Sequence, residues 1–495
     1  MSQIKVNNLS FSYEGSYEKV FDNINLILDT DWKLGLIGRN GKGKTTFLKL
    51  LLGEYKYNGS ITKSVNLDYF PFNIENENLD TLDIINNIIP NVEDWEIFKE
   101  LNLINTNIEI LYRPFNTLSG GEKVKALLVT LFLKDNEFLL IDEPTNHLDE
   151  KSKKDVENYL KNKKGFILVS HDRTLLNNVV DHILSINNKD IEIVKGNYDS
   201  WRENRDNINS FEIMKNEKLN KDINRLKMAA QQTNNWSNDI EKTKTGNKVS
   251  GLRPDRGYIG HQSAKMMKRS KVIEGRIEKE IEEKENLLLN IDKTFELIMK
   301  PEICKKKELI IAKDLQIKYD NKEIFNKVSF CVENTDRVSL TGENGSGKSS
   351  IIKLILGENI SYNGYFSVKN DLKISYVAQD TREVYGSLKD YANKFKVDES
   401  IFRAMLQKLG VESKYFNRDL TELSEGQKKK VMIARSISES AELYIWDEML
   451  NYIDIQSREQ IESMILKYKP TILFVEHDET FRNKIMTKEI VLEKI

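Results

Sequence analysis

An internal repeat constrains this chain more than any other feature of its sequence. Four short patterns occur in the first half and recur in the second half, in the same order and at similar spacing. The pairs are 38–45 with 342–349, 118–122 with 423–427, 140–143 with 445–448, and 167–171 with 472–477. This self-similarity indicates a tandem duplication, so we expect each half to fold as a domain of the same kind.

The first repeated pattern, Gly-x4-Gly-Lys-Ser/Thr, is typical of a loop that binds phosphate. In both halves it lies between an apolar run suited to a strand and one suited to a helix, which would aim backbone N–H groups at an anion. The lysine would reach the outer phosphates and the next hydroxyl would ligate Mg²⁺. We therefore expect ATP and Mg²⁺ as ligands. The loop residues assigned to the nucleotide are Gly38, Asn40, Gly41, Gly43, Lys44, Thr45 and Thr46, and Gly342, Asn344, Gly345, Gly347, Lys348, Ser349 and Ser350.

An Asp-Glu pair ends an apolar run in each half. Asp142 and Asp447 would lie near the metal, which Thr45 and Ser349 would also ligate. Glu143 and Glu448 are the candidates for polarising the attacking water, and a salt bridge at a strand end is their alternative role. The histidines that recur in register, His171 and His477, are expected to bond the terminal phosphate.

Between about 200 and 305 the sequence favours helices. Apolar residues recur at intervals of mostly three or four between 211 and 230 and again between 273 and 281, whereas four glycines and a proline interrupt 244–261. The pattern predicts two long antiparallel helices joined by a loop at 244–261. A coiled-coil spacer without further function is the alternative. The predicted domains are 1–199, the linker 200–305, and 306–495.

Basic residues are concentrated around the predicted loop. The chain has a formal net charge of −2, but residues 241–271 carry nine basic and two acidic residues, a net charge of +7. Such a patch suits contacts with RNA phosphates, whereas a solvated surface is its ordinary alternative. The basic residues assigned to RNA are Lys242, Lys244, Lys248, Arg253, Arg256, Lys265, Lys268, Arg269 and Lys271.

The remaining composition narrows the class of protein. No apolar run approaches the roughly 18 residues that a membrane helix needs, and the N-terminus has no signal-like stretch. Two cysteines are too few for a disulfide framework or a four-cysteine zinc site. We therefore expect a cytoplasmic protein.

The segment Leu-Ser-Gly-Gly-Glu at 118–122 resembles the signature of the ATP-binding cassette proteins. The resemblance implies an α/β fold with two tandem cassette domains joined by the helical hairpin. It also implies two ATPs held head to tail, each between one phosphate loop and the other domain's signature. Lys44 would then pair with Ser424 and Gly426, and Lys348 with Ser119 and Gly121. Tyr13 and Tyr319 match the aromatic that stacks on adenine in this family, with simple packing as the alternative.

The two sites differ at positions that the family uses. Gln379 matches a glutamine that helps to hold the metal and orient water, but the first half has Phe72 there. The second signature has Glu425 in place of a glycine. Both departures fall on the site built on Lys44, so we predict faster turnover at the site built on Lys348.

Two cassettes fused through a long paired-helix linker resemble the ABC-F proteins. That resemblance implies a partner, the 70S ribosome, with binding at the E site and contacts to 23S rRNA and P-site tRNA; the fused pair removes the need for a homodimer. The segment 446–454 looks like that of the Lsa-type antibiotic-resistance members. The implied activity is ribosome protection, in which the linker displaces P-site tRNA and frees lincosamides, streptogramin A compounds or pleuromutilins from the peptidyl-transferase centre. A housekeeping translation factor and a transporter ATPase subunit are the alternatives, with a DNA-repair cassette protein a distant third.

Overall fold

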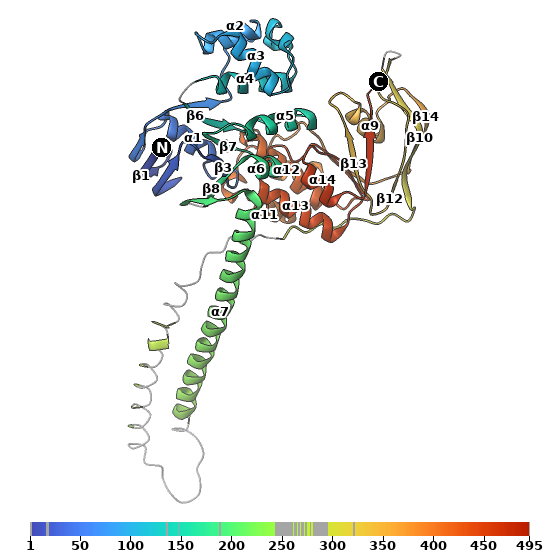
Figure 1. The fold of residues 1–495 in the computed structure, drawn as a ribbon. Coiled ribbons are helices and arrows are strands. Elements are labelled where there is room, and N and C mark those ends of the chain that lie inside the picture. The colour runs from blue at the N-terminus through green and yellow to red at the C-terminus, as the bar shows by residue number, and fades with distance from the viewer. Residues whose placement is uncertain are drawn as a thin grey trace, which may run out of the picture. The chain divides into compact units, whose positions relative to one another are not determined.

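The computed structural model describes residues 2–15, 19–134, 137–146, 148–187, 190–242, 296–319 and 322–494, and nine positions between 261 and 280. The chain divides into two compact units (Figure 1). One unit combines Met1–Trp201 with Thr294–Ile495, and the other is Arg202–Lys293. The first unit therefore contains both copies of the sequence repeat, named here the first and second repeats.

In the first repeat, a six-stranded sheet of order β5-β6-β7-β3-β8-β9 carries the phosphate loop. Strand β7 is apolar and buried along its length, and β6 is so between its charged end residues, as expected of parallel strands covered on both faces. Only β9 runs antiparallel to its neighbour. A second, antiparallel sheet has the order β2-β1-β4. The strands are β1 Gln3–Phe11, β2 Phe21–Asp29, β3 Lys33–Ile37, β4 Asn58–Lys63, β5 Asn66–Phe70, β6 Glu137–Asp142, β7 Phe166–Val169, β8 His182–Asn187 and β9 Asp190–Lys195.

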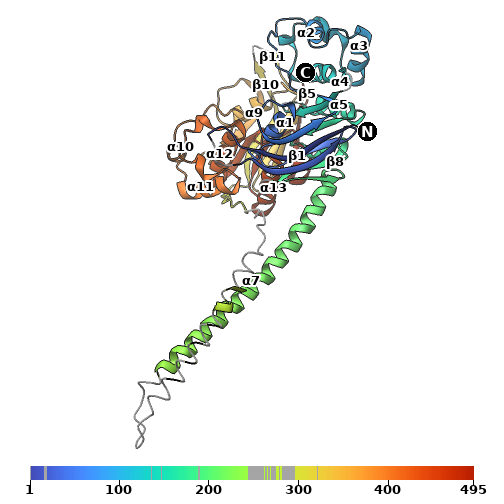
Figure 2. The same cartoon turned by 90° about the vertical axis from the view of Figure 1, so that its left-hand side faces the viewer.

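Alternate residues of the central strands face two different cores. Leu34 and Leu140 pack with the antiparallel sheet and α1, whereas Ile37 and Ile141 pack with the other helices. The helices are α1 Lys44–Leu52, α2 Thr81–Ile88, α3 Asp94–Leu103, α4 Gly120–Phe132, α5 Glu150–Lys161 and α6 Arg173–Val179. Figure 2 shows α2, α3 and α4 gathered as a group of their own.

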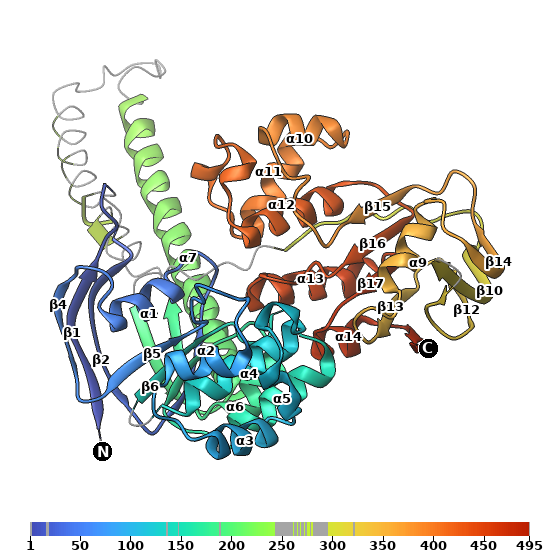
Figure 3. The ribbon, with the colours of Figure 1, turned by 90° about the horizontal axis from the view of Figure 1, so that it is seen from above.

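The second repeat has the same design, which confirms the tandem duplication. Its main sheet has the order β15-β16-β17-β13-β18, which matches β5-β6-β7-β3-β8 strand for strand. The strands are β10 Glu308–Tyr319, β11 Lys322–Glu323, β12 Val328–Glu333, β13 Arg337–Gly342, β14 Tyr362–Val368, β15 Ile374–Val377, β16 Leu443–Asp447, β17 Ile472–Val475 and β18 Lys488–Leu492. The helices are α9 Lys348–Ile355, α10 Leu388–Lys394, α11 Glu399–Lys408, α12 Glu425–Ser438, α13 Ile455–Tyr468 and α14 Glu479–Ile485. In Figure 3, α10, α11 and α12 form the counterpart of the α2–α4 group.

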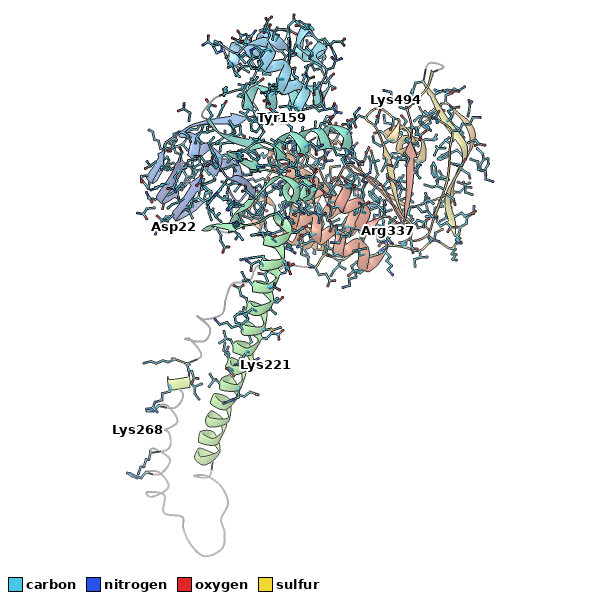
Figure 4. The ribbon with its side chains drawn as sticks, in the orientation of Figure 1. Asp22, Tyr159, Lys221, Lys268, Arg337 and Lys494 are labelled. Carbon is cyan, nitrogen blue, oxygen red and sulfur yellow. The ribbon has the colours of Figure 1, made fainter. Side chains whose placement is uncertain are left out.

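The first predicted linker helix is confirmed as α7, Tyr198–Lys242, whose 45 residues correspond to about 67 Å. All nine described positions between 261 and 280 are helical, and Lys221 and Lys268 extend outward from their backbones (Figure 4). The predicted loop lies outside the described residues except for His261, which is helical. Of the residues assigned to RNA, Lys244, Lys248, Arg253, Arg256, Arg269 and Lys271 and the side chain of Lys242 lie outside them as well.

The end of the predicted linker packs with the second repeat. Leu297 and Met299 are both 1% exposed and belong to its core, and Lys408 donates a hydrogen bond to the Glu296 carbonyl at 2.7 Å. This short apolar stretch is therefore buried although it continues no helical pattern, and the domain boundary at 305 stays a prediction. Among the described residues, no helix is both long and apolar enough to cross a membrane.

Candidate nucleotide sites

The two phosphate loops have the same local geometry. Gly43 and Gly347 precede α1 and α9 in the left-handed region, with φ of 94° and 91°. A Cβ on Gly43 would meet the Val20 side chain at 2.8 Å, so only glycine fits. The Lys44 and Lys348 ammonium groups each donate a hydrogen bond to the first glycine carbonyl of their own loop at 2.8 Å. Both loops therefore present a helix N-terminus and a lysine to an anion.

The signature segments form helix N-termini for a reason visible in the sequence. Ser119 and Ser424 each begin a capping box, in which the serine oxygen accepts from the backbone N–H three residues on while that residue's side chain accepts from the serine N–H. Helices α4 and α12 therefore start at the residue that follows each serine.

The Lys44 site is a cavity of about 520 Å³ shared by the two repeats. The Asn40 amide donates to the Tyr452 carbonyl at 2.6 Å, which joins the first phosphate loop to the second repeat. The cavity is lined by Tyr13, Val20, Asn40, Gly41, Gly43, Lys44, Thr45, Thr46, Asp142, Glu143, Asn146, Val169, His171, Ser424, Glu425, Gly426 and Tyr452. The structure thus brings the first phosphate loop and the second signature together.

The Lys348 site is arranged differently. A cavity of about 350 Å³ is lined by Ile324, Asn344, Gly345, Gly347, Lys348, Ser349, Ser350, Gln379, Glu448 and His477. A neighbouring cavity of about 610 Å³ has Gly342 and Lys348 on one side and Asp149, Glu150, Lys151 and Lys154 of the first repeat on the other. Ser119 and Gly121 line neither cavity. The start of α5 faces that loop in these cavities, and the expected pairing of Ser119 and Gly121 with Lys348 stays a prediction.

Both sites offer hard oxygen ligands that fit Mg²⁺. The Thr45 hydroxyl donates to Asp142 Oδ2 at 3.0 Å, and burial raises the pKa of Asp142. In the second repeat, burial and then the nearby Glu448 raise the pKa of Asp447 to about 6, while a hydrogen bond from Ser349 opposes the rise. Buried carboxylates of this kind favour a cation beside them.

Tyr69 is a residue of the Lys44 site that the sequence analysis missed. Its hydroxyl donates to Asp142 Oδ2 at 3.1 Å from the adjacent strand β5. The signal was available, because Tyr69 precedes Phe72 by three positions just as Tyr376 precedes Gln379.

The two candidate catalytic glutamates share one backbone geometry. Glu143 and Glu448 have φ of 50° and 46°, which is uncommon for residues other than glycine, and their N–H groups bond to Val169 and Val475 at 2.9 Å. His171 Nε2 lies 3.3 Å from Glu143 Oε1, and the second repeat has the same pair, His477 with Glu448, at 3.5 Å.

The surroundings of the two carboxylates differ. Burial, aided by Asp142, raises the pKa of Glu143 to about 8. Burial acts on Glu448 as well, but hydrogen bonds from His477 and Asn451 hold its pKa below the usual value. Gln379 also donates to Glu448 Oε2 at 2.7 Å. The corresponding Phe72 ring lies under the Lys134 ammonium, 5.1 Å from the ring centre.

The two candidate adenine-stacking residues are not equivalent. Tyr13 lines the Lys44 cavity, and its hydroxyl lies 2.6 Å from Thr46 Oγ1. Tyr319 is 45% exposed, lies 3.4 Å from Ser350 Oγ, and does not line the Lys348 cavities.

A buried ion pair joins the two repeats beside these sites. Arg173 at the start of α6 bonds to Glu462 of α13 through both terminal nitrogens and lies 3.8 Å from Asp478. Glu462 is fully buried and also accepts from Lys484 at 2.8 Å. This pair fixes α6 of one repeat against α13 of the other.

Replacing Arg173 by alanine should destabilise the protein by about 3 kcal/mol, because the change leaves a buried carboxylate short of a partner. Because Lys484 still donates to Glu462, the loss of stability should lie at the lower end of the range for breaking a buried ion pair. The measurement is urea unfolding of the full chain followed by circular dichroism. The matched control is Arg382→Ala, which removes an exposed pair with Asp380 and should leave the urea midpoint close to that of the unmodified protein. Equal midpoints for the two variants would contradict the expectation.

Comparisons with known proteins agree with the duplication. The family model described as ABC transporter matches residues 21–146 and again 325–451. The ribosome protection protein VmlR of Bacillus subtilis is 27% identical over 490 residues, which cover 97% of this chain and 85% of that protein. The erythromycin resistance ATP-binding protein MsrA of Staphylococcus epidermidis is 28% identical, covering 92% of this chain and 91% of that protein.

A solved structure supports the fold alone. The archaeal ribosome recycling factor aABCE1, in complex with the stalk protein aP1, matches with a TM-score of 0.63 at 17% identity. The match covers 98% of this chain and 87% of that chain.

Proposed function

Because this chain belongs to the ABC transporter family through both halves, as an ATPase of its ABC-F group, we propose that it is a ribosome-protection factor. The observation that carries the proposal is the extent of similarity to VmlR and MsrA. Those matches cover more than nine tenths of this chain, so they include the linker as well as the two cassettes. A transporter subunit would share the cassettes but would not call for a long helical linker between them.

At each site, residues of this chain would bind the phosphates of ATP, hold the metal and activate the attacking water. The loop amides and Lys44 or Lys348 would hold the phosphates, and Asp142 with Thr45, or Asp447 with Ser349 and Gln379, would hold Mg²⁺. The metal, when bound, neutralises charge on the phosphates. Glu143 and Glu448 would accept the proton of the attacking water, and His171 and His477 would bond the terminal phosphate.

The ATP-bound form would bind a drug-stalled ribosome at the E site, with the linker displacing P-site tRNA. Contacts with 23S rRNA and tRNA would come from the basic residues around 241–271, and hydrolysis would release the protein into the cytoplasm. Lincosamides, streptogramin A compounds and pleuromutilins are the drugs proposed. A housekeeping ABC-F translation factor is the second candidate, because it would use the same two cassettes and linker without conferring resistance.

Two measurements test this function together. The double variant Glu143→Gln, Glu448→Gln should accumulate on purified ribosomes in the presence of ATP and co-sediment with them, because it binds ATP but does not hydrolyse it. Expression of the unmodified chain should lower susceptibility to the three drug classes. Accumulation without resistance would favour the housekeeping factor. A variant that stays in the supernatant with ATP would refute the ribosome proposal altogether.

Charge reversal in the linker should weaken ribosome binding. Lys265 and Lys268 are exposed on a helical segment within the basic patch. Replacing both by glutamate should lower the slope of log affinity against log salt concentration by about 2, because each phosphate contact contributes about 1. The measurement is co-sedimentation at increasing potassium chloride. The matched control is Lys215→Glu with Lys218→Glu, exposed on α7 outside the patch; equal slopes for the two double variants would contradict the prediction.

A further inference from the structure

A buried lysine stands in the helix that begins at the second signature. Lys429 of α12 is 2% exposed and lines neither cavity of the Lys348 site, and its counterpart in the first repeat is Val124. A lysine is almost never fully buried unless its ammonium group has partners. The partners of Lys429 therefore indicate what this charge does inside the second cassette.

The ammonium group of Lys429 bonds to two backbone carbonyls beside the Lys348 site. Its Nζ donates to the Ala378 oxygen and to the Glu448 oxygen, both at 3.2 Å. Ala378 immediately precedes Gln379, and Glu448 is the candidate general base. One charged group thus holds the backbone at both ends of the 2.7 Å hydrogen bond that Gln379 donates to Glu448.

These two carbonyls lie just beyond the point where the two strands stop pairing. Strands β15 and β16 pair in parallel as far as Val377 and Trp446. Helix α12 packs against β15 (Figure 3), and from there Lys429 reaches the ends of both strands. Because the ladder ends there, the ammonium group extends the connection between the two backbones to the residues that follow.

The bond to Glu448 also supports an unfavourable backbone conformation. Glu448 has a φ of 46°, which costs free energy in a residue other than glycine, and its N–H donates to the Val475 carbonyl at 2.9 Å. Lys429 adds a charged donor on the carbonyl side. The equivalent carbonyl of Glu143 accepts from the Asn146 N–H at 3.5 Å, a longer bond from a neutral donor. The second cassette therefore holds its glutamate more firmly than the first.

A second buried charge accompanies Lys429. Glu476 is 4% exposed, where the first repeat has Ser170, and its Oε1 accepts from the Leu450 N–H at 2.9 Å. Burial lowers the pKa of Lys429, and the charges of Glu476 and Glu448 oppose the fall. The second repeat therefore has a lysine and a glutamate where the first has a valine and a serine. Offsetting the charge of Glu476 is the structural alternative for Lys429, which a test has to distinguish from a role at Glu448.

We propose that Lys429 is a positioning residue of the Lys348 site. Its ammonium group holds the end of the strand before Gln379 against the backbone of Glu448, which keeps the amide within hydrogen-bond distance of the carboxylate. This role rests on the function proposed above for Glu448, which accepts the proton of the attacking water. Lys429 itself lies outside both cavities and transfers no proton. Val124 has no polar group for this task, in agreement with the slower turnover predicted at the Lys44 site.

The test uses the full chain without ribosomes, in a Glu143→Gln background that suppresses turnover at the Lys44 site. Lys429→Met removes the ammonium group but keeps most of the length of the side chain. It should lower single-turnover hydrolysis about 10- to 100-fold, because small displacements of catalytic groups have effects of this size. The ATP concentration for half-saturation should change little, since the phosphate loop is untouched. The matched control is Lys389→Met, an exposed lysine of α10 in the same cassette, which should keep the parental rate.

A second substitution separates positioning from charge compensation. Lys429→Met should also lower the urea midpoint, because it leaves the Glu476 carboxylate buried without this cation. Adding Glu476→Gln removes the second charge, keeps an acceptor for the Leu450 N–H and should raise the midpoint again, while the hydrolysis rate stays as low as in Lys429→Met. A rate restored by Glu476→Gln would show that Lys429 only offsets a charge and would overturn the proposal. So would an unchanged rate in Lys429→Met, or a raised half-saturating ATP concentration at an unchanged maximal rate.

One further comparison keeps this outcome distinct from that of the base assignment. The double variant Glu143→Gln, Glu448→Gln should hydrolyse ATP more slowly than Glu143→Gln alone. Equal rates would overturn the assignment of Glu448, and the role of Lys429 with it. A slow double variant beside an unaffected Lys429→Met would overturn the positioning role alone.

Discussion

Replacing Glu448 by glutamine should lower steady-state ATPase activity about tenfold or more, whereas Glu143→Gln should lower it about twofold or less. A general base contributes roughly 10²- to 10⁴-fold to the rate at its own site, so the overall loss depends on which site carries most turnover. Glu448 has the better surroundings, because Gln379 and Asn451 both donate to its Oε2, at 2.7 and 3.0 Å. Its pKa is held low, and it is ready to accept a proton.

The groups around Glu143 favour its action as a general base less than those around Glu448 do. Burial and the neighbouring Asp142 raise its pKa, which disfavours the ionised form that a base needs, and its cassette has Phe72 where the other has the amide. Phosphate release by the two single variants and by the double variant gives the comparison. Equal losses from the two single substitutions would show that both sites turn over alike and would contradict the inequality.

Replacing Gly426 by alanine should lower single-turnover hydrolysis at the Lys44 site about 10- to 100-fold, measured in the Glu448→Gln background. The added Cβ would lie 2.7 Å from the Tyr452 carbonyl and 3.1 Å from the Asn40 amide nitrogen. A backbone oxygen cannot move aside as a flexible side chain can, so the signature and the segment that carries Tyr452, both in the second cassette, must shift, which disturbs the contact with Asn40 of the first. Overpacking of this kind costs about 1–3 kcal/mol, which corresponds to the range given.

Two glycines of the first signature provide matched controls. A Cβ on Gly120 meets nothing within 4 Å, so Gly120→Ala should leave the rate unchanged. A Cβ on Gly121 meets the Ser152 Oγ at 2.8 Å, a side chain that can rotate, so its replacement should have a small effect. A Gly426→Ala rate close to that of Gly120→Ala would show that closure at Lys44 does not need this contact.

Much of the fold follows from local sequence. The tandem repeat predicts two domains of one kind, and the matching strand orders β5-β6-β7-β3-β8 and β15-β16-β17-β13-β18 confirm it. The helical pattern after residue 200 predicts a long helix, and α7 confirms it. These features are readable because a phosphate loop needs its own strand and helix, and because apolar periodicity is a local property.

Contacts between the two cassettes were harder to predict from the sequence. No pattern in the sequence indicates that Tyr452 reaches the Lys44 cavity, because its position depends on how the two cassettes meet. The placement of α5, instead of Ser119 and Gly121, opposite Lys348 has the same origin. Tyr69 was missed for a different reason: its match with Tyr376 was readable in the sequence, but a tyrosine inside a strand indicates no function until it is seen to contact Asp142.

Covalent fusion of the two cassettes has a genetic consequence. If two identical chains formed such a pair, every substitution would appear at both sites, and replacing Gln379 by phenylalanine would disable the whole enzyme at once. Within a single gene, Phe72 and Gln379 coexist, and each site is free to diverge while the other preserves activity. Joining two gene copies in frame therefore lets the two ATP sites of this protein acquire different residues. The difference between Phe72 and Gln379 is one such divergence.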